Sequence, residues 1–269
     1  MLGLRGVSLS FGGVKAIDNL DLDLSDGIVG ALIGANGAGK TSVLNVINRF
    51  YEPQSGSVQY DDVDILRLRS HQVIKHGISR SFQNVALFNQ LTVFDNLLVG
   101  ADHISRPGLL TNLFRLPKAR RHGREARKRA ERVLEFLDIS HLRARRASEL
   151  PFGERKLVDM GRALTTDPKL LLLDEPAAGM PEARHESLAK LIRQIPGEWE
   201  ASVLLIDHSM ALVLSAASHV VGWTRRRTNR RRKHGRHIPH ARAPLCGGLA
   251  QQSSRTAPQR RYLQPRRSH

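Results

Sequence analysis

Eight residues near the N-terminus have the spacing of a phosphate-binding loop. They form the pattern G-x-x-x-x-G-K-[ST] and are Gly34, Ala35, Asn36, Gly37, Ala38, Gly39, Lys40 and Thr41. Glycines let backbone N–H groups turn inward around a phosphate, and the N-terminus of a following helix adds a positive dipole end. In such loops the lysine reaches the β- and γ-phosphates and the hydroxyl ligates Mg²⁺. A glycine-rich turn is the alternative, but chance gives the full pattern in roughly 1% of chains this long.

The flanking sequence has the strand-loop-helix context that this motif requires. Residues 28–33 are an apolar run typical of a buried strand, and residues 41–47 are typical of the first turns of a helix. We therefore predict a nucleotide site, and its ATP-binding residues within this segment are Gly34, Asn36, Gly37, Gly39, Lys40, Thr41 and Ser42.

Two adjacent carboxylates form the second group of residues suited to phosphate chemistry. Residues 170–173 are four leucines, which predict a strand buried on both faces, and Asp174 and Glu175 follow them. An aspartate at such a strand end can hold Mg²⁺, and the adjacent Glu175 can take a proton from an attacking water. A buried strand that ends in an acidic turn is the alternative, but a phosphate loop needs such a carboxylate and no other segment offers a good one.

Three further residues at expected strand ends have two interpretations each. Phe11 could stack on an adenine or be an ordinary apolar residue at a strand end. Gln83 could sense the γ-phosphate through Mg²⁺ and water, although most glutamines in this position are only solvated. His208, after the apolar strand 203–206, could contact the γ-phosphate or be structural.

The remaining pattern predicts an α/β protein without a membrane span. Alternation predicts strands over 4–11 and 17–24, a short β segment around Val58 and Tyr60, and a strand over 77–83. Helices are expected over 91–99 and over a segment whose apolar face is Ala126, Ala130, Val133, Leu134 and Leu137. Residues 115–132 carry nine basic and two acidic side chains, which indicate a solvated helix face or a surface for lipid or an acidic partner.

Positive charge is concentrated at the C-terminal end. The formal net charge is +17, but residues 222–269 contain 14 Lys and Arg and no Asp or Glu, which leaves 28 basic and 25 acidic residues elsewhere. The charge therefore belongs to the tail and gives no reason to expect a nucleic-acid-binding domain. The single cysteine, Cys246, excludes an internal disulfide and fits a reducing compartment.

Taken in order, the motifs resemble those of the ATP-binding subunits of ABC transporters. The phosphate loop is followed by S-F-Q at 81–83 (the Q-loop), L-P-F-G-E at 150–154 in the place of the signature L-S-G-G-Q, L-L-L-L-D-E-P at 170–176 (Walker B) and I-D-H at 206–208 (the switch histidine). The resemblance covers residues 3 to about 221. D-E-P-A-A-G at 174–179 and L-F-N-Q-L-T-V-F-D-N-L-L-V at 87–99 look most like the ATPases of high-affinity branched-chain amino acid importers. Similar subunits serve urea import.

The resemblance implies a P-loop NTPase fold: a RecA-like core with a mainly parallel sheet, a small antiparallel β subdomain, and an inserted helical subdomain at about 84–150. It implies an ABC ATPase domain over 1–221 that sits at the cytoplasmic face of the membrane. Its expected partners are a second ABC subunit, permease subunits and a solute-binding protein, and no nucleic acid. ATP and Mg²⁺ are the implied ligands. Glu175, His208 and Gln83 would be catalytic, Thr41, Gln83 and Asp174 would hold Mg²⁺, and the signature segment would bind the other subunit's ATP through Pro151, Phe152, Gly153 and Glu154.

The sequence departs from the family pattern in the signature segment, in the tail, and in the D-loop, where Met180, Pro181 and Glu182 lack the usual aspartate. Pro151 replaces the signature serine and removes a hydroxyl and an N–H donor, while Glu154 replaces a glutamine. After Val221 the family would continue with a strand and a short helix, whereas residues 222–269 are rich in Arg, His and Pro. We expect this basic tail to be disordered and weigh a frameshift, a disordered segment that binds nucleic acid or anionic lipid, and a solvated segment without a role.

These departures keep two other functions open. One is a soluble ABC-type ATPase associated with nucleic acid, although such proteins usually carry tandem ABC units or a long coiled coil. The other is an inactive nucleotide-binding remnant.

Overall fold

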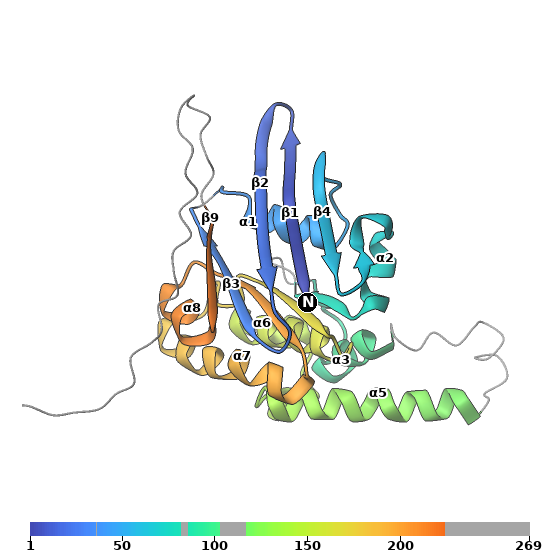
Figure 1. The fold of residues 1–269 in the computed structure, drawn as a ribbon. Coiled ribbons are helices and arrows are strands. Elements are labelled where there is room, and N and C mark those ends of the chain that lie inside the picture. The colour runs from blue at the N-terminus through green and yellow to red at the C-terminus, as the bar shows by residue number, and fades with distance from the viewer. Residues whose placement is uncertain (36, 82–85, 103–116, 224–269) are drawn as a thin grey trace, which may run out of the picture. The chain divides into compact units, whose positions relative to one another are not determined.

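An antiparallel sheet forms one side of the molecule. The structure is a computed structural model that describes residues 1–35, 37–81, 86–102 and 117–223. This sheet has the strand order β2-β1-β4-β5 and is drawn upright in Figure 1. Its strands are β1 (Leu2–Phe11), β2 (Val14–Leu24), β4 (Ser55–Tyr60) and β5 (Val63–Asp64). Leucines and valines at alternating positions of β1 and β2 are buried, so one face of the sheet is apolar.

A parallel sheet contains the strands whose C-terminal ends lead to the candidate site residues. Its order is β6-β7-β8-β3-β9 and all its neighbouring pairs are parallel. The strands are β3 (Val29–Gly34), β6 (Ile78–Ser81), β7 (Leu170–Asp174), β8 (Ser202–Ile206) and β9 (His219–Trp223). Since parallel strands share a direction, the residues that follow β3, β7 and β8 all lie at the same edge of the sheet.

The four leucines of β7 explain how the two sheets are joined. Leu170 and Leu172 pack into a core shared with the antiparallel sheet and α1 (Lys40–Ile47), while Leu171 and Leu173 pack into a second core with helices on the other face. Side chains alternate between the faces of a strand, so a continuous apolar run is needed to fill both cores. The strand buried on both faces that the sequence predicts is confirmed.

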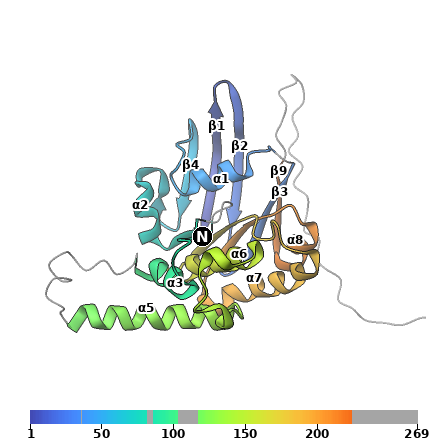
Figure 2. The ribbon, with the colours of Figure 1, turned by 180° about the vertical axis from the view of Figure 1, so that it is seen from behind.

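Helices cover the second face of the parallel sheet. They are α3 (Val93–Asp102), α5 (Pro117–Phe136), α6 (Phe152–Leu164), α7 (His185–Trp199) and α8 (Met210–Ala216). The short α2 (Ser70–Val73) and five 3₁₀ turns (Ile65–Arg67, Ile74–His76, Ser140–Leu142, Ala147–Glu149 and Glu182–Arg184) complete the described helices. Figures 1 and 2 show α5 extending beyond α3. No helix in the described ranges is both long and apolar enough to cross a membrane.

Several element boundaries differ from those expected: β1 and β2 begin earlier, at Leu2 and Val14, β6 begins at Ile78, and two further differences are informative. The helix predicted over 91–99 begins at Val93, because the Thr92 hydroxyl accepts the N–H of Asp95 at 3.1 Å and caps the helix, and it continues to Asp102. Strand β9 extends to Trp223, so two residues assigned to the tail belong to the sheet, where Gly222 and Trp223 pair with Ile33 and Gly34. The rest of the tail lies outside the described residues.

Candidate active site

The phosphate loop connects β3 to α1 through two glycines in a conformation that other residues rarely adopt. Gly37 and Gly39 have φ of 74° and 91°, in the left-handed region. A Cβ on Gly39 would also lie 2.0 Å from the carbonyl oxygen of Ala16, on the neighbouring hairpin. The first turn of α1 contains no acidic residue, so nothing there offsets its positive dipole end. The loop is thus shaped for an anion.

Lys40 is folded back onto this loop. Its Nζ donates to the carbonyl oxygens of Gly34 at 2.7 Å and Ala35 at 3.0 Å, and the residue is only 5% exposed. Burial lowers the pKa of Lys40, while the charges of Glu175 and Asp174 oppose this shift. The ammonium group is therefore close to both carboxylates, in the position from which a loop lysine can reach phosphates.

Asp174 ends β7 as a fully buried carboxylate with one oxygen engaged. Its Oδ2 accepts from the guanidinium of Arg80 at 2.6 Å, and the other branch of Arg80 donates to Asn45 Oδ1 at 2.6 Å. Asp174 Oδ1 is buried and has no hydrogen-bond partner among the described residues. An unsatisfied buried acceptor is costly, so this oxygen is suited to bind a cation as one of its ligands.

Glu175 has a strained backbone and a carboxylate directed at a histidine. Its φ is 50°, a conformation that costs a non-glycine residue about 1–3 kcal/mol. Its N–H donates to the carbonyl of Ile206 at 2.7 Å, and its carbonyl accepts from Lys156 Nζ at 3.3 Å. Glu175 Oε1 lies 3.0 Å from Nε2 of His208. The turn after β7 is therefore held in the geometry that directs this carboxylate toward the residue after β8.

One cavity of about 520 Å³ collects most of the predicted site residues. It is lined by Phe11, Val14, Ala16, Gly37, Gly39, Lys40, Thr41, Ser42, Glu175 and His208. Gly34 and Asp174 end the adjoining strands, and Asn36 and Gln83 lie outside the described residues. Phe11 is 46% exposed and has an edge contact with Tyr51, with 4.9 Å between ring centroids. An exposed ring at the mouth of a phosphate loop is available for stacking.

Sequence reasoning missed Val14 and Ala16 as lining residues. They lie in β2, and the β1–β2 hairpin brings them over the loop. No sequence pattern indicates this role; in the structure, the apolar Val14 is 56% exposed although it lies in a strand.

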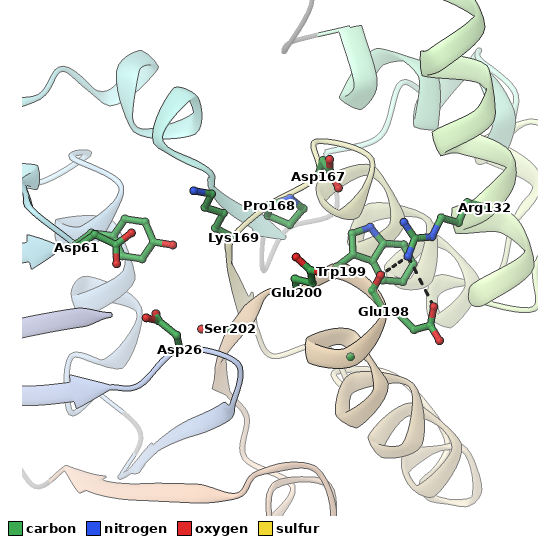
Figure 3. A pocket seen from close by; sticks show the side chains of 12 residues that line it. Asp26, Asp61, Arg132, Asp167, Pro168, Lys169, Glu198, Trp199, Glu200 and Ser202 are labelled. Atoms are coloured by element: carbon green, nitrogen blue, oxygen red, sulfur yellow. Dashed lines mark hydrogen bonds and ion pairs between the residues drawn. The ribbon is translucent and has the colours of Figure 1, made fainter.

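A second cavity, of about 600 Å³, lies near the opposite edge of the parallel sheet (Figure 3). Lys169 and Ser202 from the starts of β7 and β8 line it, together with Asp26, which precedes β3. Five carboxylates, those of Asp26, Asp61, Asp167, Glu198 and Glu200, outnumber the two cationic side chains of Arg132 and Lys169. This charge balance does not suit a phosphate, so the cavity at the phosphate loop is the candidate nucleotide site.

The predicted signature segment lies at the N-terminus of α6 and does not line the nucleotide cavity. Pro151 is the N-cap and offers no side-chain hydrogen bond, and Phe152 is 48% exposed. Glu154 Oε2 is buried without a hydrogen-bond partner among the described residues. Gly179, with φ of 73°, touches the Phe152 ring so closely that a Cβ there would lie 2.5 Å from Phe152 Cδ1. The segment is thus fixed against the loop that follows Walker B.

No cluster of three or more His, Cys, Asp or Glu side chains within the described ranges could hold a metal ion by itself. A cation at this site would need ligands from a bound molecule, as Mg²⁺ does when it binds to substrate phosphates with one or two carboxylates.

Comparisons with known proteins agree with this geometry. Residues 17–178 match the ABC transporter family. The chain is 37% identical to the high-affinity branched-chain amino acid transport ATP-binding protein BraF of Pseudomonas aeruginosa, over 82% of this chain and 87% of the relative. It is 36% identical to LivG of Escherichia coli, which has the same description, over 82% and 86% of the two chains.

Solved structures give the same result. A nucleotide-free ATP-binding cassette from an ABC transporter is 30% identical, with a TM-score of 0.69 over 84% of this chain and 88% of the other. The ADP conformation of an ATP-binding cassette of an ABC transporter is 31% identical, with a TM-score of 0.70 over 83% and 87%. The predicted P-loop NTPase fold is confirmed.

Proposed function

This chain belongs to the ATP-binding proteins of the ABC transporter family, and we propose that the transport it powers is the import of branched-chain amino acids. The family membership makes it a nucleotide-binding ATPase of ATP-driven transport. The observation that supports the solute is the 37% identity to BraF over most of both chains. Import of urea or of another amino acid is the alternative.

We assign the following roles to the residues around the cavity. The backbone between Gly37 and Gly39 and the ammonium group of Lys40 bind the phosphates, and Phe11 stacks on the adenine. Glu175 accepts the proton of the attacking water, and His208 contacts the γ-phosphate. The 3.0 Å approach of His208 to Glu175 supports this assignment, because one site must hold both groups against the same phosphate.

Mg²⁺, when it binds with ATP, neutralises charge on the phosphates. The hydroxyl of Thr41 and Oδ1 of Asp174 would hold it, with Gln83 as a further expected ligand. The buried Oδ1 without a hydrogen-bond partner among the described residues supports this fit.

The exposed signature segment supports a head-to-tail partnership with a second ABC subunit, whose ATP would bind at the N-terminus of α6. The backbone N–H of Gly153 and the dipole of α6 can bind an anion even though Pro151 has no N–H to donate. We further propose that permease subunits and a solute-binding protein complete the transporter, with this chain peripheral to the membrane at its cytoplasmic face.

Size-exclusion chromatography of the Glu175→Gln variant, with and without Mg-ATP, tests the proposed mechanism beside the wild-type ATPase rate. We expect a dimer only with ATP, together with measurable wild-type hydrolysis. A protein that binds ATP but stays monomeric in both conditions would contradict the proposal that two copies of this chain alone form the ATP sites. Failure of the wild type to bind ATP would overturn the proposal.

The solute is tested separately, in membrane vesicles that contain this chain with its own permease subunits and solute-binding protein. We expect ATP-dependent uptake of labelled leucine, isoleucine or valine. Uptake of urea instead would leave the ATPase assignment intact and would identify urea as the transported solute.

The basic tail supplies the test of the rival class, a nucleic-acid-associated ATPase. Any binding to nucleic acid is expected to disappear when the chain is truncated after Trp223 and to fall steeply with salt. Binding that survives truncation and stimulates ATP hydrolysis would favour the rival.

A further inference from the structure

Helix α6 contacts two functional parts of the molecule at once. Its N-terminus carries the signature segment, and one turn further along, the Nζ of Lys156 donates to the backbone carbonyl of Glu175 at 3.3 Å. Lys156 is only 5% exposed, so a long cationic side chain has been turned inward. Lysine is almost never buried without a compensating partner, so the hydrogen bond to the Glu175 carbonyl helps to offset the cost of burying this charge.

The carbonyl that Lys156 holds belongs to the strained residue of the active site. Glu175 has φ of 50°, and its N–H is fixed by the carbonyl of Ile206 at 2.7 Å. The parallel sheet therefore holds one side of this residue and α6 holds the other. A strained conformation persists only where its surroundings over-determine it, so loss of either contact would let Glu175 relax and turn its carboxylate away from His208.

The signature end of α6 is in contact with Lys156. Phe152 and Lys156 are four residues apart on one helix, and the Lys156 Nζ lies 5.8 Å from the centre of the Phe152 ring. The tight contact of that ring with Gly179 joins the first turn of α6 to the loop that begins at Glu175. The signature segment is thus connected to both ends of this loop, at Glu175 through Lys156 and at Gly179 through Phe152.

The surroundings of Lys156 are suited to a cation that binds a carbonyl. Burial lowers the pKa of Lys156, and the charges of Asp159, Asp174, Glu175 and Asp207 oppose that shift. These carboxylates come from α6, β7, the turn after β7 and the turn after β8. The side chain therefore lies where the helical elements meet the catalytic edge of the sheet.

We propose that Lys156 is a positioning residue that couples the signature end of α6 to the backbone of Glu175. The inference rests on the proposed function, in which the second subunit's ATP binds at this helix end. Binding there fixes α6, Lys156 then fixes the carbonyl of Glu175, and the carboxylate of the same chain is held ready for its own ATP. Each site would thereby sense whether the other is filled.

The test compares Lys156→Met and Lys156→Arg with wild type, and uses Lys190→Met, at an exposed position of α7, as the matched control. Loss of one charge-assisted hydrogen bond is expected to lower kcat about tenfold or more in Lys156→Met, with less than about a twofold change in KM and in the Kd for ATP. Lys156→Arg keeps a donor and is expected to recover most of kcat. The control is expected to match wild type.

Three results would overturn the inference. The first is an unchanged kcat in Lys156→Met beside an active wild type, which would leave the proposed function standing. The second is an equal loss of kcat and ATP affinity in both variants, which would mean a structural role. The third is a wild type that binds no ATP, which would remove the proposed function as well. Should Lys156→Met fail to fold, Lys156→Gln takes its place with the expectation of an intermediate kcat, and a kcat equal to that of wild type would overturn the inference.

Discussion

The phosphate-loop half and the signature half of the proposed ATP site are built differently within one chain. Around the phosphate loop the functional groups are joined to one another within the chain: buried Lys40 to the loop carbonyls, buried Asp174 to Arg80, and the partly buried Glu175 to the exposed His208. At the signature segment Pro151 caps a helix without a side-chain hydrogen bond and Phe152 is half exposed. The first half is organised within the subunit, whereas the second presents groups that a partner would complete. Substitutions should therefore cost much more in the first half.

The largest effect is expected from Arg80→Met, which breaks the buried ion pair with Asp174. Both side chains are almost fully buried, at 6% and 0% exposure, and an uncompensated buried charge costs about 3–5 kcal/mol of unfolding free energy. Urea denaturation measures this loss. The double variant Arg80→Met/Asp174→Asn removes the orphaned charge and should recover part of it. A double variant no more stable than the single one would contradict this account.

Gly39→Ala is expected to abolish useful nucleotide binding. The added Cβ would collide with the Ala16 carbonyl at 2.0 Å and would strain a left-handed residue, so the Kd for ATP should rise by about 100-fold or more. Isothermal titration with Mg-ATP provides the measurement. Gly197→Ala is the matched control, because a Cβ there has nothing within 4 Å and φ is not positive. Equal affinities in the two variants would contradict the role of Gly39.

Phe11→Ala tests whether the exposed ring beside the phosphate loop stacks on the adenine of ATP. The ring is 46% exposed, so its loss should hardly change stability, while a lost base stack of about 1–2 kcal/mol should raise KM for ATP roughly 5- to 30-fold. Steady-state hydrolysis at varied ATP gives KM and kcat separately. We expect kcat to stay within about twofold of wild type. An unchanged KM would mean that Phe11 is an ordinary apolar residue at a strand end and does not stack on the adenine.

The smallest effect is expected from Pro151→Ser in the second half. Serine restores a hydroxyl and an N–H donor, and one added hydrogen bond predicts a rise of about threefold in kcat/KM. Stability should change by less than about 0.5 kcal/mol, because the gain of a helix cap offsets the lost rigidity of proline. Thermal unfolding and ATPase assays measure the two quantities. A rise far above tenfold would show that Pro151 cripples the site and would remove the contrast between the halves.

The sequence alone determined the features that depend on local pattern. The flanking pattern of the phosphate loop predicts a strand before it and a helix after it, and the four leucines predict a strand with both faces buried; both are found. The family order of the motifs also led to the fold, which the comparisons confirm. These signals are readable because backbone conformation and strand alternation depend on neighbouring residues.

Only the tertiary structure showed which residues support those motifs. Arg80 is 94 positions from Asp174, and Lys156 is 19 positions from Glu175, so no periodicity connects either pair. Ala16 restricts Gly39 from a separate hairpin, and an alternating strand pattern carries no sign of it. Such contacts form between elements distant in sequence, so they depend on how sheets and helices pack. The carboxylates proposed for the site, Asp174 and Glu175, could be named from the strand that precedes them, but Arg80 and Lys156, the cations that bind to them, had to be found in the tertiary structure.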